Sequence, residues 1–353
     1  MDNSSKKETI RHDRSPRKRN NLILMIITTV FVIGGIIAIA PIALSRSKED
    51  AYIRIPKNMD YAQLTDTLEK SFGPDFTKKV LFLMKARKVD ISRRYGAYQI
   101  KKGASPFGVM HRLSSGAQTP VRLTINHFRS LHNLGDGISR KVNFTSDEFV
   151  NTALDSTLLK KYGLTPKQAL SLFMENTYEV YWTSTPKEVI EKIGEFYQDV
   201  WNPENIEKAE LLGLTPAEVM TVASIVDEET NRKREKGHIG QLYINRLNKG
   251  MKLQADPTVK YALNNFSIKR ITNDMLQTES PYNTYRVNGL PPGPIRTTSE
   301  ATVQAILDAP ETDDIYMCAK DDFSGYHNFA TTYEKHIENA MKYQNELNRR
   351  GIK

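Results

Sequence analysis

The sequence is poor in the residue types that mark metal and redox chemistry. Cys318 is the only cysteine among 353 residues, so no disulfide can form within the chain. The sequence has no P-loop, no HExxH motif and no pair of cysteines, and without these motifs neither a nucleotide site nor a zinc site is predicted. No metal or organic cofactor is indicated. A part of this protein outside the cytoplasm would therefore depend on apolar burial alone for its stability.

Charge is missing from one long segment. Residues 22–44, LILMIITTVFVIGGIIAIAPIAL, contain no charged side chain, and at about 1.5 Å of rise per residue such a helix spans a hydrocarbon core roughly 30 Å thick. A cleaved signal peptide is the alternative, since Ala38-Ile39-Ala40 has the small-x-small pattern of a cleavage site. However, the apolar run exceeds the usual h-region of about 7–15 residues, and Pro41 follows that site directly. The sequence therefore predicts an uncleaved transmembrane helix.

Basic residues gather on one side of this helix. The tail of residues 1–21 holds seven lysines and arginines against three acids, whereas residues 46–50 hold two residues of each sign. By the positive-inside rule the tail is cytoplasmic, and everything after the helix lies outside the plasma (inner) membrane. The net charge of +9 also raises the question of nucleic acid. The densest basic cluster, residues 17–19, abuts the helix where an orientation signal is expected, so we expect no nucleic-acid partner.

A short pattern occurs three times between residues 55 and 138. Each copy has an isoleucine, an aspartate or serine five positions later, and apolar residues nine and thirteen positions after the isoleucine. The copies are Ile55, Asp60, Leu64, Leu68; Ile100, Ser105, Val109, Leu113; and Ile125, Ser130, Leu134, Ile138. A strand end, a turn, an N-cap and an amphipathic helix produce this spacing. The sequence thus predicts one β-turn-α unit used three times, with a helix over residues 75–88 between the first two.

Such small β/α units resemble LysM-type modules, which bind N-acetylated glycans of cell walls. By this resemblance residues 51–140 form a glycan-binding subdomain, although a cap and two apolar anchors are what any strand-to-helix connection needs. Beyond them the pattern becomes helical, with capping signals at Thr145, Thr165 and Thr215. We therefore expect an α+β protein whose second domain, residues 141–350, is mixed but mainly helical.

Three adjacent acids, Asp227, Glu228 and Glu229, follow an apolar stretch without a linker. The capping box at Thr215 fixes the phase of this helix, and on its wheel Asp227 and Glu229 flank the apolar stripe while Glu228 points away. The stripe consists of Val219, Val222, Ala223 and Val226. A carboxyl beside such a stripe loses solvation, which raises its pKa and lets it hold a proton near neutrality, as a general acid must. The wheel does not choose between Asp227 and Glu229, and solvated acids at a helix end are the simpler interpretation.

Three later stretches resemble a known family. They are YINRLNKGMKLQADPTVKYAL, SPYNTYRVNGLPPGPI and GYHNFATTYEKH. Together with ASIVDEET and the single N-terminal anchor they resemble, in order and spacing, the endolytic murein transglycosylases of the MltG/YceG-like family. The family has one catalytic glutamate, and the resemblance carries this role to Glu229. The family's Glu-Lys-Glu is Asp227-Glu228-Glu229 here, and its Pro-Asp-Thr-Tyr element is Glu175-Asn176-Thr177-Tyr178, without the proline but with Asn176 still able to cap.

The resemblance implies a membrane-anchored lyase, a peptidoglycan lytic endotransglycosylase of class EC 4.2.2.-. Such an enzyme cleaves the MurNAc–GlcNAc bond in nascent glycan strands and limits their elongation. The 6-hydroxyl of the muramic acid attacks C1, so one glutamate acts as acid and then as base, and the product is a 1,6-anhydro sugar. The resemblance also implies peptidoglycan as the substrate and the company of penicillin-binding peptidoglycan synthases.

Several other residues are candidates for the site. Asp256 would be the second acid if the enzyme were a two-carboxylate muramidase, although a turn residue before Pro257 is the simpler interpretation. The candidates for binding acetamido sugars are Asn245, Gln254, Asp256, Tyr282, Asn283, Tyr285 and His327, each of which could equally be structural. Residues 290–295, LPPGPI, are expected to form a rigid groove wall in which Gly293 is free to adopt a positive φ. A non-catalytic glycan-binding scaffold remains the alternative to both enzymes.

Overall fold

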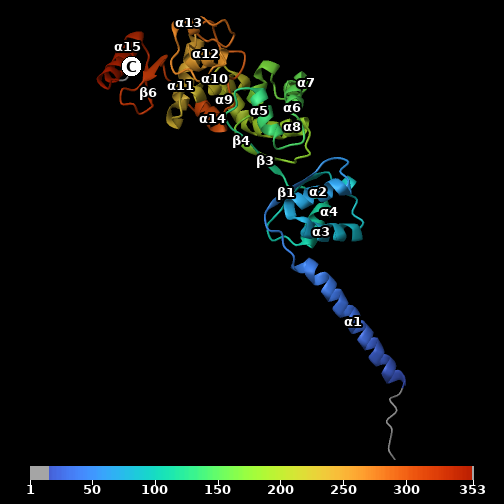
Figure 1. The fold of residues 1–353 in the computed structure, drawn as a ribbon. Helices are drawn as coiled ribbons and strands as arrows, with labels where there is room; N and C mark the ends of the chain where they lie inside the picture. The colour runs from blue at the N-terminus through green and yellow to red at the C-terminus, as the bar shows by residue number, and fades with distance from the viewer. Residues whose placement is uncertain (1–15, 352–353) are drawn as a thin grey trace, which may run out of the picture. The chain divides into compact units, whose positions relative to one another are not determined.

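The computed structural model describes residues 16–351, and the chain folds as two compact units that divide between Thr119 and Pro120. Secondary structure is mixed and mostly helical, with three two-stranded antiparallel sheets in the described residues (Figure 1). This agrees with the predicted α+β class. Residues 1–15, which make up most of the basic tail assigned to the cytoplasm, lie outside the described residues.

The first helix, α1 (Pro16–Leu44), contains the apolar segment found in the sequence. Its part from Asn20 to Leu44 is long and apolar enough to cross a membrane, a property that membrane anchors and signal sequences share. Pro41 lies inside the helix and does not end it. The predicted segment 22–44 is therefore helical over its whole length.

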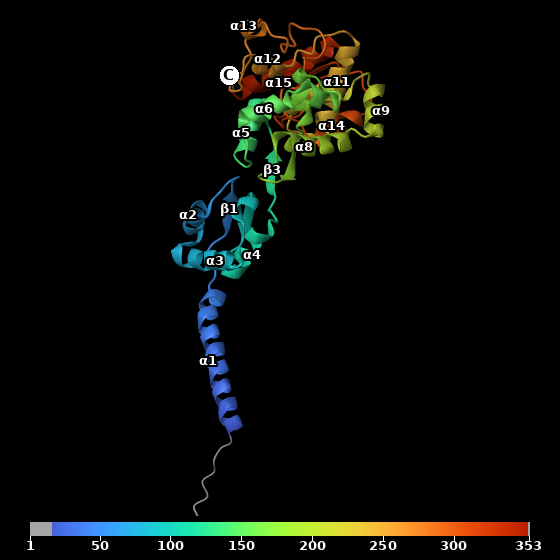
Figure 2. The same ribbon diagram turned by 90° about the vertical axis from the view of Figure 1, so that its right-hand side faces the viewer.

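The remainder of the first unit is built from the first two β-turn-α copies. Its two strands pair antiparallel, and its helices gather around them (Figure 2). The elements are β1 (Ala51–Ile55), α2 (Tyr61–Phe72), α3 (Pro74–Ala86), η1 (Ile91–Arg93), β2 (Gly96–Ile100) and α4 (Pro106–Ser115). Asp60 and Ser105 cap α2 and α4 as predicted, and the apolar anchors of both copies are buried in one core. The helix expected over 75–88 is α3.

The third copy has the predicted local structure but belongs to the other unit. Strand β3 (Val121–Ile125) precedes helix α5 (Leu131–Ser139), which Ser130 caps. However, β3 pairs with β4 (Asn176–Val180), and the anchors of α5 join the core of the second unit. The division therefore lies about twenty residues before the expected boundary, and residues 51–140 do not form one body. Spacing encodes a local unit, whereas the core that receives it depends on partners far away in the chain.

Helix α10 (Pro216–Glu229) forms the centre of the second unit. It packs against α9 (Pro203–Leu211), α11 (Lys236–Asn248), α12 (Asp256–Ala262) and α14 (Glu300–Leu307), whose ribbons surround it in Figure 1. Its side chains from residue 219 to residue 227 are all buried. The prediction of one apolar stripe was therefore too narrow, because neighbours cover this helix on every side.

The other elements of the second unit complete its shell. They are α6 (Ser146–Ala153), α7 (Ser156–Lys160), η2 (Pro166–Leu172), α8 (Pro186–Val200), η3 (Lys233–Glu235), α13 (Asn273–Leu276), β5 (Tyr316–Ala319), β6 (His327–Ala330) and α15 (Tyr333–Arg349). The predicted capping boxes are present at Thr145, Thr165 and Thr215. Strand β5 coincides with the apolar run IYMCA and pairs with β6.

Candidate active site

The three adjacent acids at the end of α10 lie in three different surroundings. Asp227 is buried, and only 4% of its side chain is exposed. Its carboxylate pairs with the ammonium of Lys236 and accepts hydrogen bonds from the hydroxyls of Thr298 and Thr302. These partners belong to α11, to α14 and to the segment before α14, so Asp227 ties the end of α10 to both neighbouring helices. Its carboxylate has no free side left for a substrate.

Glu228 is enclosed by cations. Its carboxylate oxygens accept two hydrogen bonds of 2.9 Å from Arg129, and Nε2 of His127 and NH1 of Arg296 lie at 2.9 and 3.5 Å. Only 14% of its side chain is exposed. The expectation that Glu228 faces away from the core was therefore wrong. The helix wheel shows one helix alone, whereas loops around residues 127 and 296 cover this face.

Glu229 faces an aromatic neighbour instead. The hydroxyl of Tyr243, which is 1% exposed, donates a hydrogen bond of 2.8 Å to Oε1 of Glu229. Within residues 16–351, no Lys, Arg or His nitrogen forms an ion pair with this carboxyl. Burial raises the pKa of Glu229 to about 7, against the opposing effects of the Tyr243 hydrogen bond and of the charges of Lys260 and Arg246. The group is thus about half protonated near neutral pH.

Asp256 is close enough to influence Glu229. Its negative charge contributes to the raised pKa of Glu229, and α12, which it begins, packs against α10. The carboxylate of Asp256 is exposed and accepts a hydrogen bond of 2.6 Å from the hydroxyl of Tyr285. Asp256 therefore bonds to a side chain 29 residues away, whereas the sequence suggested that it bonds within its own turn. Gln254 lies just before, exposed and at a φ of 49°.

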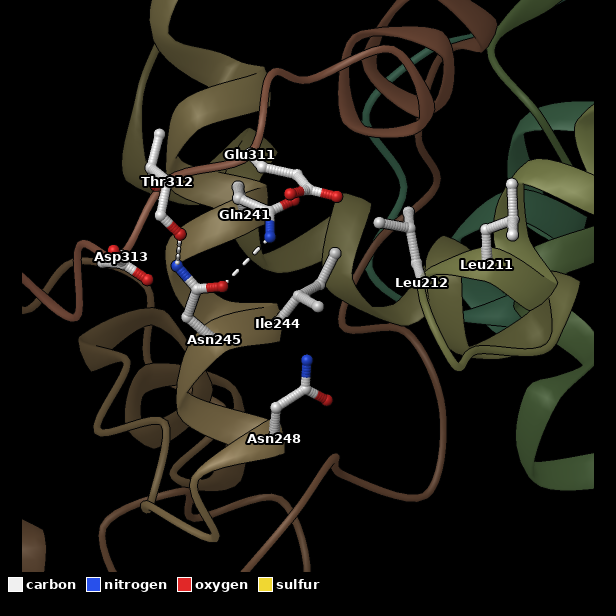
Figure 3. Close-up of a pocket in the computed structure, with 9 residues that line it drawn as sticks. All are labelled: Leu211, Leu212, Gln241, Ile244, Asn245, Asn248, Glu311, Thr312 and Asp313. Atoms are coloured by element: carbon white, nitrogen blue, oxygen red, sulfur yellow. Dashed lines mark hydrogen bonds between the residues drawn. The ribbon is translucent and has the colours of Figure 1, made fainter.

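Three of the candidate residues, Asn245, Asn283 and His327, form hydrogen bonds within the protein framework. The Asn245 side-chain amide donates to the carbonyls of Thr312 and Asp314, and its oxygen accepts from Gln241. Asn245 lines a cavity of about 470 Å³ that does not include Glu229. Leu211 and Glu311 line the same cavity (Figure 3). Asn283 is fully buried and donates to two carbonyls of its own loop, those of residues 276 and 278.

His327 is held by a buried acid that the sequence analysis did not single out. Its backbone N–H donates to Oε2 of Glu235 at 3.0 Å, and its Nδ1 lies 3.0 Å from Oε1. The same carboxylate accepts a hydrogen bond from the hydroxyl of Thr230, the residue after Glu229. His327 therefore helps to fix the chain that leaves α10. No spacing in the sequence links these residues, since His327 is 92 positions from Glu235.

Two further expectations are corrected by the backbone. Gly293 does not adopt a positive φ; it is needed because an added Cβ would lie 2.1 Å from the carbonyl oxygen of Lys167. The altered element that begins at Glu175 continues into strand β4, and Asn176 caps no helix there. Glu175 pairs with Arg296, which also approaches Glu228.

The assembled site thus contains one partly protonated carboxyl and a second, exposed one. Of the predicted residues, Glu229, Asp256 and Tyr285 come together. Their neighbours Tyr243, Lys260 and Arg246 were not predicted from the sequence. No group of three or more His, Cys, Asp or Glu side chains is arranged for a metal ion in the described part of the chain. A carboxyl that exchanges its proton near pH 7 suits general acid and base chemistry.

Known proteins are similar to this chain over most of its length. The sequence profile of the YceG-like family matches residues 53–342. A protein of Bacillus subtilis (strain 168) named endolytic murein transglycosylase is 25% identical over 321 residues, which cover 86% of this chain and 87% of that protein. A protein of the same name from Streptococcus pneumoniae serotype 2 is 23% identical over 331 residues, or 85% of this chain and 60% of its own length. The crystal structure of a yceG-like protein from Listeria monocytogenes shares the fold, with a TM-score of 0.55 at 24% identity over 83% of this chain and 99% of that one.

Proposed function

Because the chain belongs to the YceG-like family, we propose that it is an endolytic murein transglycosylase, the activity for which its relatives are named. The proposed reaction is non-hydrolytic cleavage of the MurNAc–GlcNAc bond within nascent strands, which leaves 1,6-anhydro-MurNAc ends and limits strand length. The observation that carries this proposal is the state of Glu229, whose pKa of about 7 results mainly from burial.

A single group of this kind can perform both proton transfers. In its protonated form Glu229 donates its proton to the glycosidic oxygen as the bond from C1 to that oxygen breaks. The 6-hydroxyl of the muramic acid then bonds to C1 and gives its proton to the Glu229 carboxylate. The acid is regenerated and no water is consumed. A pKa near neutrality serves both half-reactions, because neither protonation state is strongly disfavoured.

The neighbours of Glu229 have roles that follow from their contacts. Tyr243 orients the carboxyl through its hydrogen bond. We assign substrate contacts to the exposed groups Gln254 and Asp256 and to the half-buried Tyr282 and Tyr285. Asn245, Asn283 and His327, which bond to the framework, would act by holding the surrounding loops.

A two-carboxylate muramidase is the second candidate, and one observation favours it. The exposed carboxylate of Asp256 is near enough to raise the pKa of Glu229, and glycoside hydrolases use such a pair to activate water or form a covalent intermediate. The Tyr285 hydrogen bond occupies one oxygen of Asp256. The two enzymes differ in their products, since only the hydrolase adds a water to the cut end.

The cellular setting is proposed from α1 and the basic tail. An uncleaved α1 would anchor the protein in the plasma membrane, with its tail in the cytoplasm and with the rest of the first unit and the second unit outside. The first unit would engage glycan, and penicillin-binding synthases would be the partners that supply nascent strands.

The test is digestion of purified glycan strands by the full-length protein in detergent, followed by mass analysis of the new ends. We expect anhydro ends, one water lighter than hydrolytic ends. Hydrolytic ends that depend on Asp256 would establish the muramidase instead. Binding to strands without any cleavage would leave the scaffold as the function.

A further inference from the structure

A second cavity, of about 230 Å³, lies in the same unit as Glu229. Six separate stretches of the chain line it, among them the start of α5, the end of α6, η2 and the segment around Tyr282. Most of its lining residues are apolar or aromatic, and polar atoms contribute nearly as much of its surface as apolar atoms do. The residues are Ser130, Leu131, His132, Val150, Leu154, Pro166, Lys167, Leu170, Tyr261, Tyr282 and Pro294.

Two elements connect this cavity to the proposed catalytic group. Helix α12 carries Asp256 and Lys260, whose charges act on Glu229, and its next residue, Tyr261, lines the cavity. Tyr282 lines it too and lies three residues before Tyr285, which hydrogen-bonds to Asp256. Helix α12 thus contributes both to the surroundings of Glu229 and to the wall of the cavity.

The cavity is held open by contacts that involve no ligand. The rings of Tyr261 and Tyr282 meet at a centroid distance of 4.7 Å and a tilt of 48°, so each ring fixes the other. On the other side the segment around Gly293 packs tightly onto the carbonyl of Lys167. A preformed cavity binds its ligand without the cost of ordering its walls.

The charge of the lining selects one kind of ligand. Lys167 and His132 are the titratable bases on the wall, and no aspartate or glutamate lines it. Lys167 is exposed, and its ammonium makes no ion pair with the acids of residues 16–351. A cavity lined mostly by apolar residues, with a lysine among them, fits a carboxylate carried on short apolar groups. An uncharged sugar would gain no ion pair with this ammonium.

We propose that this cavity binds the stem peptide that muramic acid carries, with Lys167 pairing with a peptide carboxylate. The alanine methyl groups of the peptide would lie against Leu131, Leu154 and Leu170. This inference rests on the proposed function, because it concerns a substituent of the same substrate. It makes the enzyme selective for strands that keep their peptides, which are the strands that synthases release.

The test compares two substrates and four full-length proteins. Glycan strands with intact stem peptides are compared with the same strands stripped of peptides by an amidase. In Lys167→Met the alkyl chain stays and the charge is lost, and Leu154→Glu places a negative charge at the rim, where Leu154 is 38% exposed. Lys187→Met is the matched control, because Lys187 is also exposed but lines a different cavity. The fourth protein is the wild type.

We expect the wild type to cleave intact strands about tenfold faster than stripped strands in kcat/KM, the factor typical of one hydrogen bond to a charged group. Lys167→Met and Leu154→Glu should lose most of this preference and keep the rate on stripped strands, while Lys187→Met behaves as the wild type. Equal loss on both substrates would mean that the cavity holds sugar, and equal wild-type rates would also refute the inference while anhydro ends still form. If neither substrate yields anhydro ends, the proposed function itself fails and the inference falls with it.

Discussion

Two adjacent glutamates at the end of α10, Glu228 and Glu229, lie in very different surroundings. On one side Glu228 meets the guanidinium groups of Arg129 and Arg296 and the ring of His127, so two fixed cations face its carboxylate. On the other side Glu229 meets the hydroxyl of Tyr243 in a desolvated setting, and its pKa rises to about 7. Two adjacent residues of the same type thus acquire different chemistry from their surroundings. Glu228 is held by ion pairs with two arginines, whereas Glu229 can gain and lose a proton near neutral pH.

The largest expected effect is that of Glu229→Gln. Glutamine keeps the size of the side chain and can still accept from Tyr243, but it has no acidic proton to donate. Cleavage should fall by about 10²–10⁴-fold, the usual contribution of general acid–base catalysis, and the fold should persist. Initial rates on glycan strands, with thermal melts as the folding control, measure both. A folded variant that still forms anhydro ends would transfer the role to Asp256, the other carboxylate beside Glu229.

Asp227→Asn should lower the free energy of unfolding rather than the rate of the chemical step. The substitution leaves the Lys236 ammonium without its carboxylate partner in a site where the acid is 4% exposed. Removing one partner of a buried pair typically destabilises by about 3–5 kcal/mol, which denaturant unfolding can measure. Asp256→Asn is the control, because Asp256 is exposed and should change stability by less than about 0.5 kcal/mol. Equal losses in both would contradict the structural role of Asp227.

Glu228→Gln should have a smaller effect of the same kind. Arg129 and Arg296 would face a neutral amide, so a loss of about 1–3 kcal/mol is expected, with cleavage per folded molecule nearly kept. The helix wheel alone, on which Glu228 points away from the apolar stripe, gives no reason to expect such a loss. A cleavage loss as large as that of Glu229→Gln, in a folded protein, would show that the cationic side takes part in the reaction.

The smallest effect concerns Tyr243→Phe, and it appears as a shift in pH. The hydrogen bond from Tyr243 lowers the pKa of Glu229, so its removal should raise that pKa further above its ordinary value. The reaction begins from protonated Glu229, and activity falls as pH rises through this pKa. The basic limb of the kcat/KM profile should therefore move to higher pH in Tyr243→Phe. An unmoved limb would mean that another group controls it.

Local features of this fold were predictable from the sequence, because their signals lie within a few residues. The caps at Asp60, Ser105 and Ser130 and the anchors after them specify β-turn-α units. The same spacing could not show that β3 pairs with β4, a strand 50 residues later.

The candidate site shows the same limit. The resemblance singled out Glu229, and the structure adds the desolvation that gives this residue a pKa near neutrality. The partners of Glu228 were out of reach, since Arg129 lies 99 positions before it and approaches only in the folded chain. His327 and Glu235 form another such pair, 92 positions apart.

The protonation of Glu229 makes folding a proton-uptake reaction. Its carboxyl has an ordinary pKa of 4.5 and a pKa of about 7 in the fold, so between these values the folded protein binds more protons than the unfolded chain. Stability therefore declines as pH rises through this interval, and the loss is complete above about pH 7. Each proposed turnover takes the molecule through its less stable, ionised form. The Tyr243 hydrogen bond and the charge of Lys260 lower the pKa of Glu229 and thereby limit that loss. Because glutamine does not ionise, Glu229→Gln should gain resistance to unfolding at alkaline pH as it loses activity.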